Sequence, residues 1–228
     1  MVGILNALLP NMADKYPQFL KALLDTIIMV LWSGSFSLLF GTFLGVVLVI
    51  CKKGGILQNK PLFQITDKLV NLFRSIPFII LLAGLLNVTR FIMGTAIGVK
   101  GAIVPLIVGT TPFYARQIET ALSEVDCGLV EAAQAMGSSN LEIIFRVYLK
   151  ESTASIIRGT TITLVSLIGL TAMAGAVGAG GIGDFAIRYG YNRHQTDVTF
   201  LSVAAIVLLV YLIQLIGRKA AGKGKIIN

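Results

Sequence analysis

Five long apolar segments, separated by short polar connections, dominate the hydrophobic pattern of the chain. A helix that crosses about 30 Å of hydrocarbon needs about 20 apolar residues, because each residue adds about 1.5 Å. Segments of this kind lie near residues 22–51, 69–88, 96–115, 156–177 and 198–216. The pattern therefore predicts an all-α membrane protein with five transmembrane helices, and the length of 228 residues predicts a single transmembrane domain over residues 1–228.

The second and third segments contain prolines, which interrupt helical hydrogen bonding. The apolar part of the second segment after Pro77 is too short to span alone, so we expect this helix to begin near Leu69 and to kink at Pro77. Pro105 and Pro112 lie inside the third segment, where neighbouring helices can satisfy the freed carbonyl groups. We therefore interpret both segments as transmembrane helices.

Composition and charge agree with a membrane location and predict an orientation. The chain is 55% hydrophobic and only 13% charged, with a mean hydropathy of +0.84, whereas about a quarter of the residues of soluble domains are charged. Thirteen of the nineteen lysines and arginines lie in the first connection, the third connection and the tail, or in the helix ends that flank these connections. Because these residues are retained in the cytoplasm, we expect the amino terminus outside and the carboxyl terminus inside. The net charge of +8 then reflects topology and contact with anionic membrane lipid, not nucleic acid.

The third connection, residues 124–150, carries two short amphipathic patterns on the predicted cytoplasmic side. The first pattern places apolar residues at helical spacing and ends at Gly137, where a left-handed residue would close a helix. Ser139 and Glu142 then match a capping box for a second helix. Helices this short need a surface to pack against. That surface is either the membrane domain of the same chain or a groove on a partner protein. The two apolar stripes are Leu129, Ala132, Ala133 and Met136, followed by Leu141, Ile144, Phe145 and Tyr148.

The segment Glu131-Ala-Ala, three residues, then Gly137 resembles the EAA loop of ATP-binding-cassette (ABC) importer permeases. That family usually has a proline after the aliphatic residues that follow, whereas this chain has Lys150. The resemblance extends over nearly all of the chain, which is most similar in these segments to the methionine-uptake branch of the family. The further segments that carry it are Arg74-Ser-Ile-Pro-Phe-Ile-Ile-Leu-Leu, Ala102-Ile-Val-Pro-Leu, Pro112-Phe-Tyr-Ala-Arg, Ala172-Met-Ala-Gly-Ala-Val-Gly-Ala-Gly-Gly-Ile-Gly and Tyr189-Gly-Tyr.

The resemblance implies a permease subunit of a type I ABC importer in a bacterial inner membrane. It implies a homodimer that binds two cytoplasmic ABC ATPase subunits, which hold ATP and Mg²⁺, and that receives methionine from an extracytoplasmic substrate-binding protein. The residues leave the preferred enantiomer, L or D, open. The coupling helix that contacts the ATPase would contain Leu129, Glu131, Ala132, Ala133, Met136 and Gly137. Nucleotide closure would then move the permease halves as rigid bodies.

The end of the fourth segment is rich in small residues and has two readings. The first is close helix packing, as at Gly41 and Gly45 of the first segment. The second, by analogy with the family, is a gate, in which Met173 lines an apolar constriction that excludes ions when closed. The gate residues would be Met173, Gly175, Val177 and Gly178.

A polar and aromatic connection precedes the fifth segment on the predicted outer side. Such mixtures are typical of the membrane interface, but tyrosine and arginine also anchor protein interfaces. The candidate residues for docking of a binding protein are Arg188, Tyr189, Tyr191 and Arg193.

The chain shows no catalytic residues and no metal site. No charged residue lies in the middle of a predicted span, and His194 is the only histidine. The segment from Gly217 to Lys223 resembles a phosphate-binding loop but lacks the final Ser or Thr and follows a membrane span rather than a strand. We therefore expect a transport subunit and not an enzyme. The alternatives are the same architecture with another amino acid or a small peptide as cargo, and a membrane-embedded enzyme acting on lipid or peptide.

Overall fold

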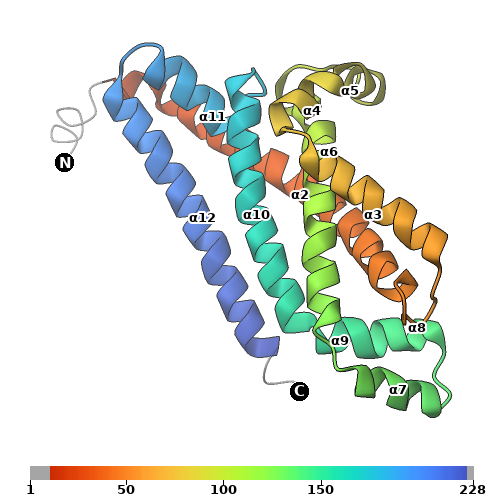
Figure 1. Ribbon diagram of the computed structural model, residues 1–228. Helices are drawn as coiled ribbons and strands as arrows, with labels where there is room; N and C mark the ends of the chain where they lie inside the picture. Colours follow the sequence, from red (N-terminus) through yellow and green to blue (C-terminus); the bar gives the residue numbers. More distant parts are fainter. Residues whose placement is uncertain (1–10, 225–228) are drawn as a thin grey trace. The chain divides into compact units, whose positions relative to one another are not determined.

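The structure, a computed structural model, describes residues 11–224 and is all-helical over them, without a strand. Four long helices follow the predicted spans closely: α2 (Tyr16–Cys51), α6 (Gly98–Ser123), α10 (Thr153–Ala176) and α12 (Thr196–Gly224) (Figure 1). Pro105 and Pro112 both lie within the continuous α6. The prediction of an all-α membrane-type protein is therefore confirmed.

The second predicted span differs from the structure. Instead of one helix that begins near Leu69, the chain forms α3 (Lys60–Ser75), α4 (Phe78–Gly84) and α5 (Leu86–Met93). Asn59 caps α3, because its side chain accepts a hydrogen bond of 3.1 Å from the amide of Leu62. Ile76 is extended, as expected for a residue before proline, and α3 ends there.

The predicted number of five membrane-crossing helices is not confirmed by the described part of the chain. Of the helices in the described part of the chain, α2, α10 and α12 are each long and apolar enough to cross a membrane. The pair of α5 and α6 qualifies as a fourth, although its members are bent by 118° relative to each other. The sequence of α3 is amphipathic and includes Asp67, Lys68 and Arg74, so α3 is not apolar enough to cross a membrane by itself.

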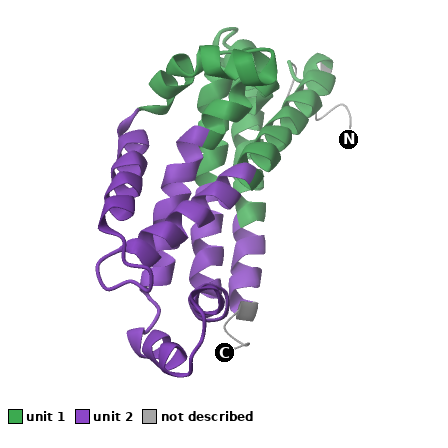
Figure 2. Ribbon diagram, turned by 90° about the vertical axis from the view of Figure 1, so that its right-hand side faces the viewer, with its two compact units in different colours: residues 1–35, 77–107, 164–213 green, residues 36–76, 108–163, 214–228 purple. Residues whose placement is uncertain are grey.

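The chain divides into two compact units (Figure 2). Unit 1 contains residues 1–35, 77–107 and 164–213, and unit 2 contains residues 36–76, 108–163 and 214–228. Each of the four long helices begins in one unit and ends in the other. A further two segments are π-helical: η2 (Ile143–Tyr148) in unit 2 and η3 (Ala186–Tyr191) in unit 1.

The core of unit 2 joins the carboxyl-terminal parts of α2 and α6 to the polar connection between α6 and α10. That connection contains α7 (Cys127–Ala135), α8 (Asn140–Glu142), η2 and α9 (Leu149–Glu151), which lie near the end of α6 in Figure 1. The residues of this core are Val49, Tyr114, Ile118, Leu122, Val130, Ala133, Ile143 and Tyr148.

Two glycines let α2 approach α6 within unit 2. A Cβ atom on Gly41 would lie 2.7 Å from the ring of Tyr114, and one on Gly45 would lie 2.6 Å from Cβ of Ile118. Both distances are too short for a real side chain, so the two helices are in backbone contact here. The packing reading of the Gly41 and Gly45 pattern is therefore confirmed.

A polar network also ties α3 to α6. The guanidinium of Arg116 pairs with Asp67 and with Glu119, and it donates to the side-chain oxygen of Asn71 at 2.9 Å. The side chains of Arg116 and Asp67 are only 20% and 31% exposed. Arg116 is thus matched by acceptors rather than left as a lone buried charge, which would be costly.

Unit 1 is built around the amino-terminal part of α2. One cluster contains Met29, Ala102, Leu106, Leu167, Ala174 and Ala179, and the other contains Met12, Phe19, Ala22, Ile182, Phe185 and Val198. The second cluster includes the short helix α11 (Gly181–Phe185), which continues into η3. These clusters bring the ends of α10 and α11 against α2.

We expect Gly45→Ala to lower stability by about 1–3 kcal/mol, because the new methyl group has no room between α2 and α6. Gly169→Ala is the matched control, since a Cβ atom there meets nothing within 4 Å. The measurement is the midpoint temperature at which the purified protein in detergent loses its monodisperse form. Equal midpoints for the two variants would contradict the close approach at Gly45.

Candidate functional site

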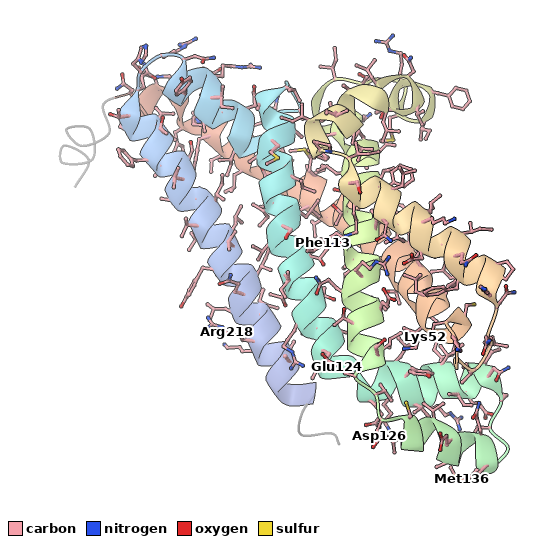
Figure 3. All side chains as sticks on the ribbon, in the orientation of Figure 1. Lys52, Phe113, Glu124, Asp126, Met136 and Arg218 are labelled. Carbon is pink, nitrogen blue, oxygen red and sulfur yellow. The ribbon has the colours of Figure 1, made fainter. Side chains whose placement is uncertain are left out.

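The first helix of the predicted coupling loop is α7, and both of its ends are fixed by its own sequence. At the start, the Asp126 carboxylate accepts a hydrogen bond of 2.8 Å from the amide of Gly128. At the end, the amide of Ser138 donates to the carbonyl of Ala133 at 3.0 Å and that of Gly137 to Gln134 at 2.9 Å. This pair of bonds is a Schellman motif. Figure 3 labels Asp126 and Met136 near the two ends of the helix.

Gly137 has the left-handed conformation that the sequence predicts. Its φ angle is +80°, a region that residues with a Cβ atom adopt only at a cost. A Cβ atom on Gly137 would meet nothing within 4 Å. The requirement for glycine here is therefore one of backbone conformation and not of space.

The predicted capping box is present at the start of α8. The Glu142 carboxylate accepts 2.9 Å hydrogen bonds from the amide and the hydroxyl of Ser139, and the Ser139 hydroxyl accepts from the amide of Glu142. The bond from the Ser139 amide, with help from its hydroxyl and from Arg146, lowers the pKa of Glu142 below its ordinary value. The turn between α7 and α8 is thus locally specified at both ends.

The apolar stripe of α7 divides between two faces. Val130 and Ala133 are buried in the unit 2 core, whereas Leu129 and Met136 are 48% and 79% exposed. Ala132 is also exposed. Of the predicted coupling residues, Ala133 therefore belongs to the buried face, and the others in the stripe form an open apolar face.

The second stripe divides in the same way. Ile144 and Tyr148 are buried, but Leu141 and Phe145 are 68% and 65% exposed. Ile144, Phe145 and Tyr148 lie in the π-helical η2, whose wider turn departs from the 3.6-residue period that the sequence interpretation assumed. That interpretation missed the buried Val130 and Ile143, although Val130 stands three positions before Ala133 and could have been found by this spacing.

Glu131 is exposed on α7 and lines a pocket of about 220 Å³ within unit 2. Other residues of this pocket are Lys52, Cys127, Gln134 and Tyr148. Burial raises the pKa of Tyr148 above its ordinary value, with a smaller effect from Cys127. Cys127 is exposed and Cys51 is buried, and neither forms a disulfide.

The predicted gate segment is the end of α10, and it combines a packed face with an open one. A Cβ atom on Gly175 would lie 2.5 Å from the amide nitrogen of Asp184, so α10 and α11 are in backbone contact. The helix ends in a second Schellman motif, in which Ala179 donates to the carbonyl of Ala174 at 3.1 Å and Gly178 has a φ angle of +91°. On the other face, Met173 and Val177 are 50% and 52% exposed.

The predicted docking residues lie on or just after η3. Arg188 forms an ion pair of 3.2 Å with Asp184, and the guanidinium of Arg193 lies 5.1 Å from the centre of the Tyr189 ring. Tyr189 packs against the unit 1 cluster, whereas Tyr191 is 74% exposed. Tyr191 and the two arginines are therefore accessible, and Tyr189 acts as their support.

No group of three or more potential metal ligands occurs among residues 11–224.

The chain belongs to the family of binding-protein-dependent transport system inner membrane components, whose sequence pattern matches residues 37–219. It is 47% identical over 198 residues to a probable D-methionine transport system permease protein MetI of Vibrio cholerae, covering 87% of this chain and 88% of that relative. It is 44% identical over 171 residues to the methionine import system permease protein MetP of Bacillus subtilis, covering 75% and 77%.

A similar solved structure is an inward-facing conformation of the MetNI methionine ABC transporter. The TM-score is 0.91 at 40% identity, and the match covers 93% of this chain and 98% of that chain. The resemblance to the methionine-uptake branch is therefore confirmed. The family places the chain among multi-pass inner-membrane transport components and not among enzymes.

The stability of the α7–α8 turn should depend on pH through Glu142. Because the folded pKa of Glu142 is lowered, its bonds to Ser139 stabilise the turn above the ordinary carboxyl pKa. That contribution is lost as the pH falls through the lowered value. Hydrogen exchange of residues 138–144, followed by mass spectrometry, should accelerate over this range beyond the intrinsic effect of pH.

Glu142→Gln is the control for this prediction, since an amide accepts similar bonds but does not titrate in this range. The variant should show only the intrinsic pH dependence of exchange. Identical profiles for the two proteins would remove Glu142 as the source.

Proposed function

We propose that this chain is the membrane-spanning permease subunit of an ABC importer that carries methionine into a bacterial cell. The observation that carries this proposal is the close match, 0.91 in TM-score over 93% of the chain, to a methionine ABC transporter. The identity of 47% to a methionine permease supports the same cargo. ATP hydrolysis then occurs in a separate ATPase subunit.

The assembly that we propose is a homodimer of this chain with two ABC ATPase subunits and an extracytoplasmic methionine-binding protein. Its amino terminus lies outside and its carboxyl terminus in the cytoplasm, a prediction supported by the distribution of lysine and arginine. In this orientation α7 lies on the cytoplasmic side, and α11 and η3 lie on the outer side.

In this proposal α7 is the coupling helix. Its buried face anchors it to unit 2 through Val130 and Ala133, and its open face offers Leu129, Ala132 and Met136 to a groove on the ATPase. Glu131 lies at the edge of that face. Because α7 is capped at both ends, it would move as a rigid body when the ATPase subunits close. Gly137 sets the direction in which the chain leaves the helix.

The gate that we propose is the open face at the end of α10. Met173 and Val177 stand four positions apart, so they lie one above the other on the same helix face. Gly175 holds the opposite face against α11, and Gly178 ends the helix. An apolar constriction formed by this face and its copy in a second subunit would exclude water and ions.

The binding protein in turn would dock on Arg188, Tyr191 and Arg193, with Tyr189 as their support. Exposed arginine and tyrosine are the residue types that most often dominate protein interfaces. Their accessibility in unit 1 supports this assignment.

The experiment that tests the function is uptake of labelled methionine by proteoliposomes that contain this chain, its ATPase and its binding protein. ATP should drive accumulation, and omission of the ATPase should abolish it. Accumulation without the ATPase would contradict the proposal. Competition by other amino acids and by small peptides would reveal a different cargo.

Gly137 provides a prediction for coupling. Gly137→Val places a β-branched residue at a φ angle of +80° and strains the turn by about 1–2 kcal/mol. We therefore expect less methionine transported per ATP hydrolysed. Gly137→Asn is the control, because asparagine tolerates the left-handed region. An unchanged ratio in the valine variant would contradict a role of this turn in coupling.

A further inference from the structure

Unit 1 contains a pocket of about 470 Å³, whose lining includes the proposed gate residue Gly178 and the proposed docking residues Arg188 and Tyr189. It lies where α2 and α6 begin and α10 ends. Its volume is in the range of small-molecule sites, about 300–1,000 Å³. The wall from α2 contributes Gln18, Lys21 and Asp25, and the wall from α11 and η3 contributes Asp184, Arg188 and Tyr189.

The glycine segment Gly178–Gly181 forms one side of the pocket and is held firmly against α2. The amide of Ile182 donates to the Thr26 hydroxyl at 2.9 Å, and that hydroxyl donates to the carbonyl of Ala22 at 3.1 Å. A Cβ atom on Gly181 would lie 2.7 Å from Thr26 Oγ1, and one on Gly180 would lie 3.6 Å from Asp25 Oδ2. The absence of side chains on these glycines therefore keeps the space beside the Asp25 carboxylate open.

The charges of the pocket are balanced, with two cations and two anions. On one wall Arg188 and Asp184 pair with each other at 3.2 Å. On the other wall Lys21 and Asp25 stand four positions apart on α2, a spacing that allows an ion pair. No ion pair of either residue occurs among the described residues. The pocket thus offers one cation, the exposed Lys21, and one anion, the half-buried Asp25, that form no ion pair among the described residues.

The same pocket has an aromatic side. Phe185 and Tyr189 line it, with ring centres 5.1 Å apart, and Phe185 is almost fully buried while Tyr189 is half-buried. An apolar side chain of a ligand would therefore find a surface next to the charged groups.

We propose that this pocket binds a zwitterionic amino acid before it passes the gate. The ammonium group of the ligand pairs with Asp25, its carboxylate pairs with Lys21, and its side chain lies along Tyr189. A zwitterion can pair with both groups at once, whereas a cation or an anion can pair with only one of them, so the charge pattern favours a zwitterion. The direction of passage rests on the proposed transport function, but the binding itself does not.

The position of the pocket links it to the end of α10. Gly178 lines the pocket and is also the residue that ends the helix on which Met173 and Val177 are exposed. A ligand in the pocket therefore lies beside the segment that we propose as the gate.

The test uses the full chain in nanodiscs of phosphatidylglycerol, which has no zwitterionic headgroup. Saturation-transfer NMR measures the binding of methionine, of its methyl ester, which lacks the carboxylate, and of N-acetylmethionine, which lacks the ammonium group. We expect methionine to bind about tenfold more tightly than either analogue, because each analogue loses one charge-assisted contact.

Two variants assign the contacts. Asp25→Asn should weaken methionine binding about tenfold and leave N-acetylmethionine unaffected, and Lys21→Gln should weaken methionine and leave the methyl ester unaffected. Asp14→Asn is the control, since Asp14 is exposed on η1 (Ala13–Lys15) and does not line the pocket.

Equal binding of the three ligands, or equal effects of Asp25→Asn and Asp14→Asn, would overturn the proposal. Loss of methionine binding in nanodiscs that contain phosphatidylethanolamine would assign the pocket to a lipid headgroup and would also overturn it. Because no ATPase is present, these outcomes leave the transport function untouched. Failure of ATP-driven uptake with intact zwitterion binding would count against the transport function alone.

Discussion

Backbone contact at glycine is the interaction on which this structure depends. Gly41 and Gly45 let α2 touch α6 in unit 2, and Gly175 lets α10 touch α11 in unit 1. In a membrane the hydrophobic effect does little to bring helices together, so such close van der Waals contact has to do so. The polar network of Arg116 with Asp67, which holds α3 to α6, is the charged counterpart of this packing.

The close contacts also determine which faces remain open. Because Val130 and Ala133 fill the unit 2 core, the opposite side of α7 is left exposed with Leu129 and Met136 on it. Because Gly175 is pressed against α11, Met173 and Val177 point away from it. A coupling helix and a gate both need this arrangement, in which one face is fixed and the other is free to meet a partner.

Local signals in the sequence were sufficient to predict the end of α7 and the start of α8. Gly137 in the left-handed region and the Ser139–Glu142 capping box depend only on neighbouring residues, and both appear as predicted. The region of the second predicted span was less predictable. The start of α3 at Lys60 depends on the Asn59 cap in a polar stretch, and the bond between Asp67 and Arg116 of α6 is long-range. Val130 on the buried face of α7 was missed because that helix is apolar on two sides. The π-helical η2 could not be predicted, because the sequence interpretation assumed the 3.6-residue period of an α-helix.

The helices that carry the open faces, α7 and α10, end in the same way, with amide-to-carbonyl bonds around Gly137 and Gly178. Such endings contain no ionised group, so ionic strength has little influence on where either helix stops. In the coupling role proposed for α7, the length of the helix would therefore be set independently of the charged side chains that surround it.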